Sequence, residues 1–301
     1  MKVSVITVCK NSEAYIERAI KSVISQTYKD IEYIIIDGDS QDKTKNIIKK
    51  YANHITCFIS EPDSGIYNAM NKGIKIATGS YIQFLNSDDY FYDDNVVRDV
   101  VEFIEHNPDS DIVYGDAHIR SNPKISKNSF IVKSPLPEEI SDALIYGVLF
   151  LQGSIFFKSS IFLKLGYFSE KYKISSDYEY YSRFLNYPDL IIRYYSRNIF
   201  SYYAGGISGN VSVTLQEMFQ IQNEIDLFRS NYWQNRRILK FQSTIVELNR
   251  SLYNALEASE KQRRFIQNLK NPLFVLKMIA KYLQLKVLRE KSVSILDDLK
   301  L

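Results

Sequence analysis

Two adjacent aspartates, Asp88 and Asp89, follow a short apolar run of the sequence at residues 81–85. The run is typical of a buried strand, so the pair lies where the strand ends and a loop begins. Carboxylate oxygens are the ligands that hard divalent cations such as Mg²⁺ and Mn²⁺ prefer. The pattern therefore predicts a metal site that serves a phosphate-bearing substrate. The structural alternative is a turn and a helix cap made from the same residues.

The chain before this pair alternates strand-like and helix-like segments, which must position the two carboxylates. Such alternation indicates an α/β fold whose Rossmann-like, mostly parallel sheet is flanked by helices. Ligands of such sheets bind at the carboxyl ends of the strands. The predicted strands are Val3–Val8, Ile31–Ile36, Thr56–Ser60 and Ser80–Leu85, and the predicted helices are Glu13–Gln26, Thr44–Tyr51 and Gly65–Ala77.

The rest of the chain is less regular up to residue 210 and helical in pattern beyond it. In the last part, apolar residues such as Ile238, Phe241 and Ile245 recur at spacings of three and four, which predicts a helix with one apolar side. In the middle part, the predicted helices are Val96–His106, Ser159–Leu165 and Ser176–Asn186, and the predicted strands are Ile112–Gly115, Ser154–Phe157, Ile191–Tyr195 and Ile199–Tyr203.

Composition excludes several classes of protein. Of the 301 residues 45% are hydrophobic, enough for a large core, and the net charge of +3 argues against nucleic-acid binding. The two cysteines, Cys9 and Cys57, have neither metal-ligand spacing nor a disulfide framework. The glycine-rich motifs of dinucleotide-binding and P-loop proteins are missing. Without a signal peptide or an apolar run of about 18 residues, we expect a cytoplasmic protein.

Further carboxylates follow another predicted strand at the same edge of the sheet. Asp37 and Asp39 come directly after the second strand, in a different loop from Asp88 and Asp89. A contact with a base or a ribose suits these two side chains better than a metal. The structural alternative is an Asx turn that leads into the next helix.

Several segments, taken in order, resemble one known family. They are Val3–Asn11, Ser25–Tyr28, Tyr33–Thr44, Glu61–Gly73, Ala77–Ile82 and Phe84–Asp89. Their order, spacing and strand context are similar to those of family 2 glycosyltransferases, which have the GT-A fold. The resemblance is close over residues 1–90, looser up to residue 210, and does not include the last third of the chain.

This resemblance implies a nucleotide-diphosphate sugar donor, most often linked to UDP, and a divalent cation, Mn²⁺ or Mg²⁺. It implies that Asp89 is the direct metal ligand and that Asp88 faces the ribose and the surroundings of the metal. Around the nucleotide it implies that Thr7, Asn11 and Glu13 border the base, that Asp37 and Asp39 lie near uracil or ribose, and that Asp63 closes the site.

The same resemblance supplies a candidate catalytic base. Residues 175–183 are similar to the family's second acidic motif, in which Asp177 takes the position of the base and Glu179 is the reserve candidate. An inverting transferase needs such a carboxylate to accept the proton of the acceptor hydroxyl. The structural alternative is an N-cap at Ser176 or Asp177.

Two further polar residues stand where the resemblance places the acceptor. Gln152 occupies the position of an acceptor-side strand, and Asp116 ends a strand at the presumed active edge. We expect both to contact the acceptor, with plain structural roles as the alternative.

The sequence also departs from the family pattern. Asn86 stands where many members have the first aspartate of the metal motif, and Met70 stands where many carry an arginine toward the diphosphate. No Gln-x-x-Arg-Trp motif follows, which argues against a processive polysaccharide synthase.

Together these expectations describe an inverting, metal-dependent hexosyltransferase that moves a sugar from a UDP-sugar to a saccharide acceptor, either lipid-linked or part of a surface polysaccharide. The alternatives are a sugar nucleotidyltransferase and a non-catalytic carbohydrate-assembly protein on the same fold. The predicted domains are a catalytic domain at residues 1–210, with a nucleotide-binding half at 1–90 and an acceptor-binding half at 91–210, and a helical C-terminal region at 211–301.

The basic, apolar segment Leu273–Leu288 has two competing interpretations. As an amphipathic helix, it lies on the inner face of the cell membrane and meets a lipid-linked acceptor there. Otherwise it packs on the catalytic domain or on a second subunit of a homo-oligomer.

Overall fold

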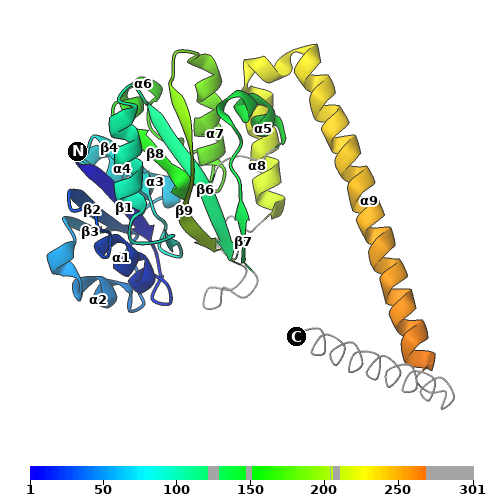
Figure 1. The fold of residues 1–301 in the computed structure, drawn as a ribbon, viewed down its shortest axis with the longest axis horizontal. Coiled ribbons are helices and arrows are strands. Elements are labelled where there is room, and N and C mark those ends of the chain that lie inside the picture. Colours follow the sequence, from blue (N-terminus) through cyan, green and yellow to red (C-terminus); the bar gives the residue numbers. More distant parts are fainter. Residues whose placement is uncertain (121–128, 147–150, 204, 206–210, 269–301) are drawn as a thin grey trace, which may run out of the picture. The chain divides into compact units, whose positions relative to one another are not determined.

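The computed structural model describes residues 1–120, 129–146, 151–203, 205 and 211–268 (Figure 1). The chain divides into two compact units, Met1–Gln234 and Asn235–Leu301. The first unit holds a mixed sheet with helices on both faces, and every strand of the described residues belongs to that sheet.

The N-terminal part of the sheet follows the predicted alternation of strands and helices. β1 lies between β2 and β4 and is parallel to both, and β3 pairs with β2, also in parallel. The carboxyl ends of these strands therefore emerge at one edge. The elements are β1 (Val3–Cys9), α1 (Ile16–Ile24), β2 (Ile31–Asp37), α2 (Thr44–Lys49), β3 (Cys57–Ser60), α3 (Ile66–Ile76) and β4 (Tyr81–Phe84).

The second part of the sheet adds antiparallel strands. β8 is antiparallel to both of its neighbours, β4 and β6, whereas β6 and β9 are parallel. The strand order is β3-β2-β1-β4-β8-β6-β9-β5, with β7 paired to β6. The elements are β5 (Tyr90–Phe91), α4 (Val96–His106), β6 (Ile112–Arg120), β7 (Ser129–Val132), α5 (Ile140–Tyr146), β8 (Ile155–Lys158), α6 (Ile161–Leu165), α7 (Ser176–Ser182) and β9 (Ile192–Tyr203).

The structure has one long strand, β9, where the sequence predicted two. The polar residues 196–198 interrupt the apolar pattern, but the strand continues through a shift of register opposite Asp116 of β6. Gly115 allows this close passage, because a Cβ at that position would lie 2.5 Å from the main-chain oxygen of Arg197 and 2.9 Å from that of Tyr195. Local sequence does not reveal a pairing of this kind.

Two core clusters cover the two faces of the sheet. Successive residues of a strand point to opposite faces, and β1 shows this clearly. Its Val3 and Val5 pack in the cluster that includes α1, α2 and α4, whereas Ile6 and Val8 pack in the cluster that includes α3, α5, α6 and α7. The sheet is therefore the middle layer of three, as the α/β prediction requires.

Two further helices follow β9. α8 (Val211–Glu224) belongs to the first unit, where the Gln222 amide donates to the Tyr178 hydroxyl of α7 at 2.7 Å. α9 (Asn231–Asn268) provides the described part of the second unit, and the apolar stripe predicted on it is exposed. Among the described residues, no helix combines the length and the apolar character needed to span a bilayer. The segment Leu273–Leu288 lies outside the described residues.

Gly115→Ala tests the close passage of β6 and β9. The added methyl group would collide with main-chain oxygens, which are unable to move aside as a flexible side chain does. We expect the free energy of unfolding to fall by about 1–3 kcal/mol, as for overpacking in a dense core. Urea unfolding followed by circular dichroism measures this change. Ser196→Ala, an exposed substitution at the same register shift, is the control and should stay within about 0.5 kcal/mol. Equal midpoints for the two variants would contradict the interpretation.

Candidate active site

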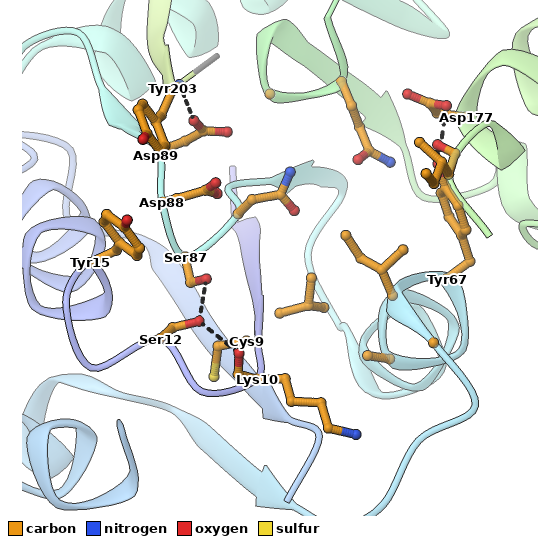
Figure 2. Close-up of a pocket in the computed structure, with 18 of the residues that line it drawn as sticks. Cys9, Lys10, Ser12, Tyr15, Tyr67, Ser87, Asp88, Asp89, Asp177 and Tyr203 are labelled. Atoms are coloured by element: carbon orange, nitrogen blue, oxygen red, sulfur yellow. Dashed lines mark hydrogen bonds between the residues drawn. The ribbon is translucent and has the colours of Figure 1, made fainter. Parts of the chain in front are cut away.

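A cavity of about 790 Å³ opens at the carboxyl ends of β1 and β4 (Figure 2). Its walls come from the loops after these two strands, the start of α3, the loop before α7 and the end of β9. Because β1 and β4 are parallel neighbours, both loops leave the sheet at the same edge. The cavity therefore lies at the edge where the sequence predicted ligand binding.

Three segments that are remote in sequence hold the carboxylate pair. Asp88 and Asp89 follow β4, and Ser87 beside them lies with its Oγ 2.9 Å from the Oγ of Ser12 in the loop after β1. From the end of β9, the main-chain N–H of Tyr203 donates to Oδ1 of Asp89 at 2.9 Å. Figure 2 shows both contacts. The pair is thus fixed by strands from both parts of the sheet.

The two carboxylates lie in an environment that disfavours their charge. Asp89 is only 2% exposed, and Asp88 is half-buried beside it. Burial raises the pKa of Asp89 well above its usual range, and the neighbouring charge of Asp88 raises it further. Burial also raises the pKa of Asp88. Two adjacent anions in such a place favour the binding of a cation.

Asn86 adds a third oxygen to this wall of the cavity. Its Oδ1 is buried and has no hydrogen-bond partner within the part of the chain that the structure describes. An unpartnered buried acceptor costs about 1–3 kcal/mol. Two carboxylates and an amide oxygen form a hard donor set suited to Mg²⁺ or Mn²⁺. In the described ranges, no three or more His, Cys, Asp or Glu side chains are arranged so that they could hold a metal ion, so a cation here would take its remaining ligands from substrate or water.

Asp177 faces the same cavity from the opposite wall, in the first turn of α7 (Figure 2). Its Oδ1 accepts the N–H of Tyr178 at 2.8 Å and lies 3.1 Å from the hydroxyl of Tyr67 in α3. That hydroxyl also lies 2.5 Å from the carbonyl oxygen of Ile174, so two acceptors share one proton. Burial raises the pKa of Asp177, which suits a group that must take up a proton near neutral pH.

The loop before α7 is held by α8. The carboxylate of Glu217 accepts the main-chain N–H groups of Lys173, Ile174 and Ser175 at 2.8, 3.0 and 2.9 Å. Charge-assisted hydrogen bonds from three consecutive residues fix the course of this loop. A helix from the region predicted as a C-terminal extension therefore shapes the wall that carries Asp177.

Asp63 enters the cavity from the turn before α3. Its Oδ1 accepts the N–H of Gly65 at 3.2 Å, while its Oδ2 lies against Gly38 in the loop after β2. A Cβ at Gly38 would overlap this carboxylate. The glycine therefore makes room for Asp63 at the nucleotide side predicted from the sequence.

Asn11 and Gln152 also line the cavity. The Oδ1 of Asn11 accepts the N–H of Gln41 at 2.8 Å, which joins the loops after β1 and β2. The amide of Gln152 donates to Sδ of Met70 at 3.4 Å. Met70 is fully buried and lies outside the lining, so its thioether stands behind this part of the wall.

Other residues predicted for the nucleotide side lie outside the cavity lining. Thr7 is fully buried in β1, with its Oγ1 3.2 Å from the hydroxyl of Tyr33. Asp37 is fully buried as well and accepts hydrogen bonds from the hydroxyls of Ser40 and Ser60 and from the N–H of Ser40. These contacts give Asp37 a structural role, although its main-chain donor is three residues on, not two as in the Asx turn that was its structural alternative.

Glu13 and Asp39 belong to the same loops but turn toward neighbouring chain segments. Oε2 of Glu13 accepts the N–H of Lys43 at 2.9 Å, and Asp39 pairs with Lys45 at 3.0 Å. Neither side chain lines the cavity.

Asp116 and Glu179, both predicted near the acceptor, also lie outside the lining. Asp116 is fully buried, where it pairs with Lys133 at 2.5 Å and accepts the hydroxyl of Tyr194 at 2.9 Å. Glu179 binds Arg183 through two hydrogen bonds of 2.9 and 2.6 Å. These contacts stabilise the strand and the helix that carry the two carboxylates.

The structure adds lining residues that were not among the predicted site residues. Tyr15 and Tyr203 both line the cavity, with ring centroids 5.8 Å apart, and Lys10 and Lys173 contribute to its walls. Tyr203 is the last residue of a predicted strand, and this position was only a weak indication that it lines the cavity. Its partner Tyr15 precedes α1, and only the folded sheet brings the two rings together.

Comparison with known proteins agrees with this geometry. Residues 4–169 match the model of the family described as glycosyl transferase family 2. A PGL/p-HBAD biosynthesis glycosyltransferase of Mycobacterium bovis is 29% identical over 213 residues, which cover 69% of this chain and 79% of that protein. The minor teichoic acid biosynthesis protein GgaB of Bacillus subtilis is 38% identical over 116 residues, which cover 36% of this chain and 13% of that protein.

A solved structure shares the fold. S. aureus TarS 1-349 in complex with UDP-GlcNAc superposes with a TM-score of 0.62 at 21% identity, over 79% of this chain and 69% of that chain. The mixed sheet flanked by helices is therefore the GT-A arrangement that the sequence predicted.

Asp89→Asn tests the electrostatic cost of the carboxylate pair. A carboxyl group whose pKa is raised by folding stabilises the fold while protonated, and that contribution is lost as the pH rises through the raised pKa. In EDTA at neutral pH, we therefore expect the amide variant to unfold at a higher urea concentration. Its free energy of unfolding should exceed that of the unmodified protein by about 1 kcal/mol or more. The difference should shrink on acidification, as Asp89 takes up its proton. A less stable variant at neutral pH would contradict this reasoning.

Proposed function

Since the chain belongs to glycosyl transferase family 2, we propose that it transfers one sugar from a UDP-sugar to a saccharide acceptor, with inversion at the anomeric carbon. One observation carries the proposal. A buried carboxylate pair and a single carboxylate of raised pKa face one cavity from opposite walls. The pair suits the diphosphate of the donor, and the single carboxylate suits the acceptor hydroxyl.

A nucleotide fits the wall that β1 and α3 build. Asp63 turns a carboxylate oxygen toward this side, and the rings of Tyr15 and Tyr203 provide aromatic faces near the carboxylate pair. Aromatic faces and acceptor oxygens are suitable contacts for a base and a ribose. The complex of TarS with UDP-GlcNAc supports UDP as the carrier.

The donor set beside Asp89 fits Mn²⁺ or Mg²⁺. Asp89 would be the direct ligand, with Asp88 and the amide oxygen of Asn86, which no group of the described chain engages, at its side. Bound there, the cation would neutralise the charge that develops on the diphosphate as UDP leaves. The family's usual arginine is not available in this chain, because the fully buried Met70 takes its place.

Asp177 acts as the general base in this proposal. An acceptor hydroxyl beside it transfers its proton to the carboxylate while its oxygen attacks the anomeric carbon of the donor sugar. The bond from that carbon to the β-phosphate oxygen breaks, and its electron pair leaves with UDP. Attack and departure take place on opposite faces of the sugar, so the configuration inverts.

The relatives support an acceptor of the cell surface. One carries the name of a PGL/p-HBAD biosynthesis enzyme and another that of a teichoic acid biosynthesis protein. Lys173, in the loop before α7, also lines the cavity and offers a cation to an acceptor that bears negative charge. We therefore place the reaction in the assembly of a cell-surface glycan.

Two substitutions separate donor binding from transfer. Asp89→Ala removes the proposed metal ligand and should abolish Mn²⁺-dependent UDP binding in calorimetry. Asp177→Asn keeps the shape of the base but removes its proton acceptor, so UDP binding should stay intact while transfer falls by about 10²- to 10⁴-fold. UDP release measured over a panel of nucleotide sugars gives the transfer rate. Full turnover by Asp177→Asn would assign the base to another residue.

Tyr67→Phe should change the pH dependence of transfer. The Tyr67 hydroxyl stabilises the charged form of Asp177 and so lowers the pKa that burial raises. Without it, the pKa of Asp177 rises further, and the acidic limb of the kcat profile should move to higher pH. Tyr172→Phe is the control, because that hydroxyl binds Glu224, which lies outside the cavity lining. An unmoved acidic limb in Tyr67→Phe would speak against Asp177 as the titrating base.

A further inference from the structure

Arg120 is a buried cation directly behind the carboxylate pair. It is the last residue of β6, it is only 2% exposed, and it is among the largest side chains of the interior. A guanidinium group in such a place is retained only when hydrogen bonds and nearby charges compensate for the loss of water. Its contacts therefore indicate what it stabilises.

The guanidinium group joins two segments that hold the pair. Its Nη2 donates to the main-chain oxygen of Asp88 at 3.0 Å and to that of Ser201 at 3.1 Å. Its Nε donates to Oγ of Ser201 at 2.8 Å. The loop after β4 and the strand β9 are thereby linked through one rigid, planar group.

The same group packs against the residues on either side of these contacts. Its carbon lies 4.3 Å from the ring centre of Tyr90, which directly follows Asp89, and 5.9 Å from that of Tyr203. Arg120 and Tyr203 are also register partners of β6 and β9. Since the N–H of Tyr203 holds Oδ1 of Asp89, Arg120 supports that hydrogen bond from the neighbouring strand.

These hydrogen bonds of Arg120 end on main-chain oxygens and on the hydroxyl of Ser201, and the carboxylates of Asp88 and Asp89 remain at the wall of the cavity.

We infer that Arg120 is a positioning residue for the metal–diphosphate side of the site, acting through the main chain of Asp88 and Ser201. The inference rests on the proposed function. The positioning role requires the planar guanidinium group of an arginine. A lysine ammonium carries its charge on a compact tip, which cannot bridge the two segments in the same way.

Three variants of the full chain test this role. Arg120→Lys keeps the charge and loses the bridge, whereas Ser201→Ala removes one acceptor and leaves the cation in place. Arg197→Lys is the matched control, because Arg197 of β9 forms a similar fork to Asp93 at 2.7 Å and to Asp99 at 3.0 Å, outside the cavity lining. Calorimetry with UDP and Mn²⁺ measures binding, and urea unfolding in EDTA measures stability separately.

Arg120→Lys should weaken Mn²⁺-dependent UDP binding by about 10- to 100-fold, as expected for a residue behind the metal ligands. Ser201→Ala should also weaken Mn²⁺-dependent UDP binding. If Arg120→Lys does not fold, the affinity of Ser201→Ala tests the inference in its place. Arg197→Lys should lose stability and keep its affinity. Unchanged affinity in Arg120→Lys, or an equal loss in Arg197→Lys, overturns the inference and leaves the proposed transfer standing. No binding by the unmodified protein overturns both.

Discussion

Burial of two adjacent carboxylates at the end of β4 is the constraint on which the rest of the site depends. Burial raises the pKa of both Asp88 and Asp89, and the neighbouring charge of Asp88 raises the pKa of Asp89 further. The fold compensates in part, with a main-chain donor from Tyr203 and a buried cation at Arg120. In the proposed function, a cation from outside and the diphosphate that it accompanies would offset the remaining imbalance.

The parallel and the antiparallel strands of the sheet support different walls of the cavity. Parallel strands β1 to β4 bring several loops to one edge and form the wall with the carboxylate pair. The antiparallel strand β8 then extends the sheet toward β6 and β9, on the side where α7 carries Asp177. In the proposed reaction, one cavity would thereby contain both a site for the leaving diphosphate and a site for the proton that the base accepts.

Buried polar groups at this edge of the sheet lower the stability of the fold, and the packing around them compensates for that loss. Among the described residues the buried amide oxygen of Asn86 has no partner, and burial raises the pKa of Asp89 well above its usual range. Such features persist only where the surrounding structure over-determines them. Two layers of apolar packing on the sheet, and the brace from Glu217 to the loop before α7, provide that support.

Sequence alone determined the elements of the first part of the chain and the place of its key carboxylates. The strands β1 to β4 and the helices between them lie within a few residues of their predicted bounds, because hydrophobic periodicity is a local property of the chain. For the same reason Asp88 and Asp89 were expected at a strand end, whereas Asp177 was proposed from the family resemblance, and all three line the cavity.

Tertiary structure decided how the residues are shared between the cavity and the scaffold. Asp37 looked as suitable as Asp63, yet Asp37 is enclosed by Ser40 and Ser60, while Gly38 admits Asp63 to the cavity. Arg120, Tyr203 and Glu217 carried no recognisable motif. Their roles depend on contacts between segments far apart in sequence, and such contacts arise only when strand order and register bring those segments together.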